Sequence, residues 1–481
     1  MAAEHEEAPR RSGDPECHYL IVSDLHLRGG FTNTTAGLYH FDEEFADFLR
    51  YYRLHRRSDR PWRLIIAGDF IEFLYITDRP DKGERLVAGC TWDEEEEYYG
   101  PESEALKARW KLDTILRSSH PQLLIAIARF IAEGNELVCL RGNHDAEMFW
   151  PEVQEHFCRL IARHHPDDVA LRDMREAVAA RVHFPDWFWH EPGVIYVEHG
   201  CQYDPFCSFE YFLNPVDPRC PTRIDSGISE LAIRFFTNPM KGIDAMAAEN
   251  IMSVSQYIGW VLTSGFRRLP DILRLYGLLV RRIVGKSGPH DPAAERAVRD
   301  EHLRRVDAMD ARFGLKPGTA RQIDAMHQTP IMRSRIGAIR FSGADIVSFI
   351  TVAVLGAFGL LVVAPDRWGL LGALIAFTAA GVVAYMAALR FGSIAEAAQL
   401  RRTAENVAAL TGSPLVVFGH SHSAGNWQLD ENTEYMNVGT WVPTGDNAFF
   451  IFAEVVTGGE RPLASVLRWN KRERCAAEYV R

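Results

Sequence analysis

The sequence lacks the features that mark several classes of protein. Its eight cysteines include no CxxC pair and suggest no disulfide framework, so the chain suits a reducing compartment. Positive charge is not in excess, because the formal net charge is −11, and no nucleic-acid partner is expected. Residues 1–16 are charged and contain no apolar run, so we expect no secretory signal peptide.

The composition is that of a globular protein. Hydrophobic residues make up 47% of the chain and charged residues 24%, which excludes a disordered or fibrous protein. At 481 residues the chain is long enough for two or three domain-sized units with a sizeable core.

Short apolar runs followed by polar or ionisable residues indicate an α/β core. Such runs, rich in Leu, Ile and Val, are typical of strands buried on both faces, and helical patterns at 42–52 and 104–131 separate the first three. The runs are 18–23, 63–67, 136–140, 194–198 and 414–418, with further strand-like stretches at 433–438, 449–455 and 464–469. In α/β sheets, ligands bind beyond the carboxyl ends of the strands, where five of these segments place Asp, His or Asn.

A long insertion divides this core. We expect a polar tail at 1–16, the first part of the core at 17–205, a helical insertion or cap at 206–345, a transmembrane helical hairpin at 346–390, a helical return at 391–412 and the second part of the core at 413–481. Within the insertion, 271–284 is apolar nearly all round and carries Arg274, Arg281 and Arg282. This pattern fits a helix in a membrane interface or a buried helix with a charged edge, and both readings stay open.

Two charge-free stretches, 346–363 and 370–389, are each close to the roughly 20 residues that span a bilayer. Arginines flank the pair on its outer sides, at 333, 335, 340, 390, 401 and 402, whereas the short loop between the stretches has only Arg367. By the positive-inside rule, the hairpin would lie in a membrane with the catalytic domain on the cytoplasmic side. The alternative is a buried helix pair, rich in Ala and Gly, inside a large soluble domain.

Five motifs occupy the ends of the predicted strands. They are Asp24-Leu25-His26, Gly68-Asp69-Phe70-Ile71-Glu72, Gly142-Asn143-His144-Asp145, His199-Gly200 and Gly419-His420-Ser421-His422. Each is weak alone, since an Asp at a helix N-cap or a surface His is the commoner explanation. Their order and common placement make a joint coincidence improbable.

The series DxH, GDxxE, GNHD, HG and GHxH resembles the calcineurin-like metallophosphoesterase superfamily over residues 18–205 and 413 to about 470. The resemblance implies a sandwich of two mixed sheets flanked by helices, with two metal ions held by strand-end loops. It also implies that Asp24, His26 and His422 bind one ion, that Asn143, His199 and His420 bind the other, and that Asp69 bridges the two.

The residue types support this allocation on physical grounds. Two divalent ions about 3.5–4 Å apart need a shared anionic ligand to offset their repulsion, and a carboxylate such as Asp69 supplies it. Carboxylates, imidazoles and one amide oxygen suit Mn²⁺ best, with Fe²⁺ or Zn²⁺ as alternatives. Glycines at 68, 142, 200 and 419 let the backbone turn sharply beneath the ions.

Two further residues are candidates for catalysis. In the family that the chain resembles, a histidine at the position of His144 stabilises the transition state or protonates the leaving oxygen. We expect Asp145 to orient that imidazole, or to cap the helix that follows.

The predicted function is hydrolysis of a phosphoester or pyrophosphate by a hydroxide activated between the two ions. The residues after Gly68 are loosely similar to UDP-2,3-diacylglucosamine pyrophosphatases, a family with Arg where this chain has His144 and without a transmembrane hairpin. A phosphorylated lipid or lipid precursor is the expected substrate, because the hairpin is inserted within the catalytic domain. The alternatives are a phosphodiesterase for a soluble nucleotide, a phosphoprotein phosphatase, or a catalytically inactive membrane scaffold.

Overall fold

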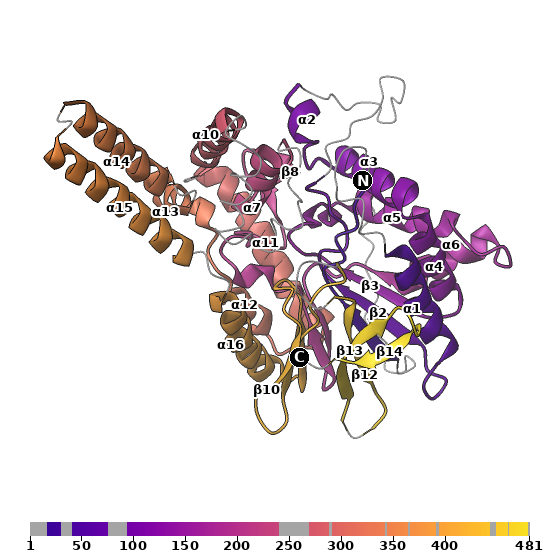
Figure 1. Ribbon diagram of the computed structural model, residues 1–481. Coiled ribbons are helices and arrows are strands. Elements are labelled where there is room, and N and C mark those ends of the chain that lie inside the picture. Colours follow the sequence, from indigo (N-terminus) through magenta and orange to yellow (C-terminus); the bar gives the residue numbers. More distant parts are fainter. Residues whose placement is uncertain are drawn as a thin grey trace.

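The computed structural model describes residues 17–29, 41–75, 94–239, 269–287, 291–341, 344–363, 366–390, 394–442, 449–459 and 461–479. The predicted polar tail lies outside these residues. The fold is α/β with two mixed sheets, as the sequence predicts (Figure 1).

The larger sheet has seven strands in the order β14-β13-β12-β1-β2-β3-β4. Its parallel half contains β1 (His18–Val22), β2 (Trp62–Ala67), β3 (Glu136–Leu140) and β4 (Val182–His183). Its antiparallel half contains β12 (Ile451–Val456), β13 (Leu463–Asn470) and β14 (Cys475–Glu478). The chain therefore returns to this sheet after the insertion, and β12 pairs with the first strand.

The second sheet has five strands in the order β10-β11-β9-β6-β5. They are β10 (Gly425–Gln428), β11 (Glu434–Asn437), β9 (Leu415–Phe418), β6 (Ile195–Val197) and β5 (Trp189–Glu191). The three central strands, β11, β9 and β6, are parallel to one another. The carboxyl ends of β6 and β9 therefore lie at one edge of this sheet.

Successive side chains along the strands of the larger sheet point to opposite faces and pack into two different hydrophobic cores. In β1, Leu20 and Val22 pack in a cluster with the helices α1 (Asp42–Leu54), α3 (Ala105–Ser119), α4 (Pro121–Ala132) and α5 (Pro151–Arg163). Tyr19 and Ile21 pack in a second cluster with strands of the smaller sheet. The helix predicted at 104–131 is thus two helices, because Pro121 starts a new one. Helix α6 (Leu171–Arg181) packs beside α4 and α5.

Among its described residues, the insertion contains helices and a short hairpin, β7 (Val216–Asp217) with β8 (Cys220–Ile224). Its helices are α7 (Ile228–Ala232), the π-helical turn η3 (Ile233–Thr237), α10 (Leu269–Lys286), α11 (Pro292–Arg312), α12 (Thr319–Asp324) and α13 (Arg335–Phe341). Leu275, Leu279 and Ile283 of α10 are buried in a separate small cluster, whereas Leu273 is exposed. Helix α10 is therefore packed along one face and has a charged edge.

A partly buried ion pair joins the insertion to the core. Nη1 and Nη2 of Arg234, in η3, donate to the two carboxylate oxygens of Glu102 at 2.9 and 3.2 Å. Burial by itself raises the pKa of Glu102. The charge of Arg234 and its hydrogen bonds lower that pKa by a larger amount, so the pKa of Glu102 is about 2. Glu102 precedes α3, so the pair connects the insertion to the helical layer of the core.

This pair predicts a pH-dependent contribution to stability. The pKa of Glu102 is lower in the folded state than its ordinary value of about 4.5. The ionised carboxylate therefore stabilises the folded protein fully at pH values above about 4.5, and this stabilisation is lost as the pH falls toward about 2. We expect Glu102→Gln to lower the free energy of unfolding at pH 7 by about 2–3 kcal/mol and to have progressively less effect below pH 4.5. Denaturant titrations from pH 7 to pH 3 measure this. The exposed Glu176→Gln serves as the control, and a difference independent of pH would contradict the assignment.

The predicted transmembrane hairpin, and the membrane localisation deduced from it, are wrong. Two paired helices do form there, α14 (Ala344–Val363) and α15 (Arg367–Arg390), and they project from the body of the molecule (Figure 1). Within the described residues, however, none of the helices combines the length and apolar character needed to cross a bilayer. The prediction used absence of charge as its criterion, and Ala and Gly, which recur in both helices, satisfy that criterion without supplying large apolar side chains.

The alternative of a buried helix pair does not hold either. Many large apolar side chains of the two helices are exposed, namely Val352, Leu355, Phe358, Val362, Val363, Trp368, Leu370, Leu371, Leu374, Ile375 and Phe377. The chain then returns to the core through α16 (Ile394–Thr411), in the range predicted for a helical return, and α16 packs against β9.

Candidate metal centre

Five loops meet where the parallel strands of the two sheets end. They follow β1, β2 and β3 of the larger sheet and β6 and β9 of the smaller one. Backbone hydrogen bonds connect neighbouring loops: the Asp24 amide donates to the Gly68 carbonyl at 3.2 Å, and the Gly419 amide donates to the His199 carbonyl at 3.0 Å. The seven predicted ligands lie on these loops, namely Asp24, His26, Asp69, Asn143, His199, His420 and His422.

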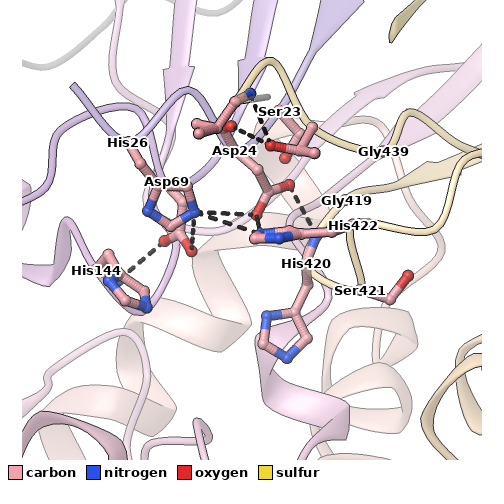
Figure 2. Close-up of polar contacts among 12 residues, drawn as sticks. Ser23, Asp24, His26, Asp69, His144, Gly419, His420, Ser421, His422 and Gly439 are labelled. Atoms are coloured by element: carbon pink, nitrogen blue, oxygen red, sulfur yellow. Dashed lines mark hydrogen bonds and ion pairs between the residues drawn. The ribbon is translucent and has the colours of Figure 1, made fainter. Parts of the chain in front are cut away.

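The first predicted ligand group is brought together. Nε2 of His422 lies 3.1 Å from Oδ1 of Asp24, and Nε2 of His26 lies 3.7 Å from the same oxygen. The two imidazole nitrogens are 3.4 Å apart (Figure 2). Atoms about 2.0–2.2 Å from one ion, at angles of about 90–110°, lie about 3.0–3.5 Å from one another, so this triangle fits a single cation.

The second group lies beside the first. Nε2 of His199 is 3.2 Å from Oδ2 of Asp69 and 3.3 Å from Oδ1 of Asn143. A ring nitrogen of His420 lies within 4.8 Å of the ligand atoms of Asp69 and His199. The second group can therefore also gather around one cation.

Asp69 stands between the two groups. Its Oδ2 is 3.8 Å from Nε2 of His26 and 3.2 Å from Nε2 of His199, so one oxygen faces a ligand of each group. Its Oδ1 accepts a hydrogen bond from the backbone amide of His144 at 2.9 Å. The side chain of Asp69 is thereby fixed with Oδ2 toward both groups. A Cβ on Gly142 would overlap this carboxylate, so glycine is required there.

The backbone beneath the ligands is strained. Nine residues other than glycine have positive φ within the described ranges, and five of them are predicted ligands: Asp24, His26, Asp69, His420 and His422. Such conformations cost about 1–3 kcal/mol each and persist where the surrounding structure enforces them, commonly at functional sites. The loops are thus built to aim these side chains inward.

Outer acceptors fix two of the ligand imidazoles. Nδ1 of His26 lies 2.9 Å from Oε2 of Glu72, and Nδ1 of His199 lies 2.8 Å from the Ala67 carbonyl. With Nδ1 donating, Nε2 of each neutral ring presents its lone pair to the centre, which is the usual arrangement of metal-bound histidines.

Glu72 also holds the predicted catalytic histidine. Its Oε2 lies 2.7 Å from Nδ1 of His144, and this carboxylate is fully buried. Burial acts to raise the pKa of Glu72, but the neighbouring His144 and His26 lower it well below its usual range. One carboxylate therefore orients both a ligand and the candidate proton donor.

Asp145 occupies a different place from the one predicted. Its Oδ1 accepts from the Gly142 amide at 2.6 Å, and its Oδ2 accepts from the Phe70 amide at 2.8 Å. It makes no side-chain hydrogen bond to cap the following 3-10 helix η1 (Ala146–Phe149). Asp145 thus fastens the loops after β2 and β3 together, and burial and the charge of Asp69 raise its pKa to about 7.

The centre contains two buried carboxylates close together. Asp24 and Asp69 are almost wholly inaccessible, at 0% and 2% exposure. Burial by itself lowers the pKa of His199. The charges of Asp69 and Asp24 raise that pKa by a larger amount, so the pKa of His199 is about 9. Buried carboxylates need a compensating positive charge, and divalent cations among these oxygen and nitrogen donors would provide it. The residues present therefore fit the implied metal pair.

Residues outside the five motifs also surround the centre. Arg28 is buried, with its guanidinium 4.3 Å from the Tyr75 ring centroid. The Tyr75 ring stacks at 6.5 Å from that of His144. Asn437 donates to the Gly419 carbonyl at 2.7 Å and supports the loop of His420. No short sequence motif identifies these contacts, because they join distant segments.

Comparisons of the chain with protein family models, curated proteins and solved structures found no match.

Proposed function

We propose that this chain is a metal-dependent phosphoester hydrolase resembling the calcineurin-like metallophosphoesterases. The observation that carries the proposal is the pair of ligand groups on either side of Oδ2 of Asp69. Two divalent ions, when bound, supply Lewis acidity toward phosphoryl oxygens and a nucleophile from water at neutral pH. The first ion would be held by Asp24, His26 and His422, the second by Asn143, His199 and His420, and Asp69 would be shared.

His144 is the proposed proton donor to the leaving oxygen. Glu72 holds Nδ1 of the ring, so Nε2 is the nitrogen through which a proton would pass. The ring lies edge-on to His26 at 4.8 Å between centroids, which places it beside the first ligand group. General acid catalysis needs such a fixed donor next to the reacting phosphoryl group.

The substrate is proposed only as a phosphoester or pyrophosphate. The expectation of a lipid substrate depended on a membrane hairpin, so it has lost its support. The inactive-scaffold alternative would be marked by a missing ligand residue, whereas all seven predicted ligand residues are present in the sequence, which supports an active enzyme.

An activity screen tests the proposal. Purified full-length protein is treated with chelator, dialysed and supplied with Mn²⁺, Fe²⁺ or Zn²⁺. It is then assayed on an aryl phosphomonoester, a bis-aryl phosphodiester and a nucleoside diphosphate sugar. We expect metal-dependent hydrolysis of at least one class, strongest with Mn²⁺ and abolished by chelator. Turnover of none of the three with any of the ions would contradict the proposal.

A further inference from the structure

A carboxylate that the sequence motifs do not include contacts a predicted ligand of the second ion. Asp204 follows the 3-10 helix η2 (Cys201–Tyr203), directly after the His199-Gly200 motif. Its Oδ2 lies 3.2 Å from Nε2 of His420, although the two residues are 216 positions apart. The fold, and not the local sequence, brings them together.

Asp204 is itself held in place by its own turn. Its Oδ1 accepts from the Phe206 amide at 2.9 Å, and its carbonyl accepts from the Ser208 amide at 2.8 Å. The returning part of the insertion is bonded to the same turn, since the Gln328 amide donates to the Gln202 carbonyl at 2.8 Å. The carboxylate is therefore a fixed acceptor and not a mobile surface group.

We propose that Asp204 is a positioning residue that sets the tautomer and orientation of His420 for the second ion. This inference rests on the proposed function. Accepting a hydrogen bond from Nε2–H of His420 leaves Nδ1 as the ring atom with a lone pair for the ion. In His26 and His199 the roles of the two ring nitrogens are exchanged: Nδ1 donates to an outer acceptor and Nε2 faces the centre.

The backbone of His420 adds a second restraint. Its amide donates to Oδ2 of Asp24 at 3.0 Å, and its φ is 66°. The residue is thus held at its backbone by a ligand of the first ion and at its ring by Asp204. Loss of Asp204 would free only the ring, and the effect should therefore fall on the second ion alone.

A separate cation on Asp204, Cys207 and His420 is the competing explanation, because their ligand atoms also lie close together. It requires the His420 ring to bind an ion through each nitrogen, and so to lose both protons. Asp204 would also have to share with a cation the carboxylate that its own turn uses. A hydrogen bond between the two side chains needs neither condition.

The test is a Mn²⁺ titration of metal-free full-length protein, with binding followed by calorimetry and bound metal by elemental analysis. Asp204→Ala, which removes the acceptor, should weaken binding of the second equivalent of Mn²⁺ about 10–100-fold and leave binding of the first unchanged. Activity at saturating Mn²⁺ should be largely kept, while the Mn²⁺ concentration for half-maximal activity rises. Asp204→Glu, which keeps the acceptor, should restore much of the affinity. Asp217→Ala, which removes a buried carboxylate of the insertion, is the matched control.

The outcomes separate this inference from the function on which it rests. Two tight equivalents in both the wild type and Asp204→Ala would overturn the positioning role and leave the proposed function standing. A third equivalent lost in Cys207→Ser would overturn it in favour of a separate cation site. Fewer than two equivalents in the wild type would overturn the proposed function, and this inference with it. A loss of thermal stability without a change in Mn²⁺ affinity would show a structural role only.

Discussion

Asp69→Ala is expected to lower bound metal from about two equivalents per chain to fewer than one. It is also expected to reduce the rate of hydrolysis to below about 1% of the wild-type rate. Asp69 is the only predicted ligand whose single oxygen faces both groups, at 3.8 Å from Nε2 of His26 and 3.2 Å from Nε2 of His199. Without it, Asp24 is the sole carboxylate in the predicted ligand set, and two divalent ions would repel each other with no shared anion between them. Elemental analysis after preparation without chelator measures the loss.

Asp69→Asn separates the effect of charge from that of packing. Asparagine can still accept from the His144 amide, so the loop after β3 should keep its place, yet the bridging charge is gone. We expect it to lose metal nearly as completely as the alanine variant. Asp168→Ala, at an exposed ion pair with Arg129, is the control and should change nothing. Two full equivalents and undiminished activity in either Asp69 variant would rule out the bridging role.

The sequence predicted the parts of the fold that depend on local pattern. The buried runs ending at Asp24, Asp69, Asn143, His199 and His420 are strands, because each is a short apolar segment that packs on both faces. The brief strands β4, β5 and β7 were not predicted, since two or three residues carry no periodicity. Pro121 was the available signal that 104–131 would divide into two helices.

The side chains that meet at the five loops could be named from the sequence, whereas the contacts that hold them in place could not. Asp145 adjoins His144 in the sequence, but its carboxylate turns back to the backbone amides of Gly142 and Phe70. Glu72, from a different loop, reaches the ring instead. Asp204 meets His420 only through folding. Such contacts depend on side-chain direction across neighbouring loops, which adjacency along the chain does not define.

His144→Ala is expected to keep both metal equivalents while lowering kcat by about 10²–10⁴-fold. Removing the ring takes away the proposed proton donor, whereas His26 retains Glu72 as its outer partner. The loss should therefore depend on the leaving group. Aryl phosphates, whose leaving oxygen needs little protonation, should suffer least, and alkyl phosphates most. Comparison of kcat for a series of leaving groups of known pKa measures this dependence.

Two controls decide between proton donation and other roles for His144. His156→Ala removes an imidazole of α5 that contacts Asp113 of α3 and no predicted site residue in the described contacts, and it should leave kcat unchanged. Glu72→Gln removes the carboxylate shared by His26 and His144, so it should weaken metal binding and slow hydrolysis together. His144 also lies in a cluster with His26 and Asp69 that is compact enough to hold a cation. Loss of one metal equivalent in His144→Ala would identify it as a ligand, and an equal loss of rate for every leaving group would exclude a proton donor. Full metal content combined with a loss that grows with leaving-group pKa would instead support His144 as the group that completes cleavage of the ester bond.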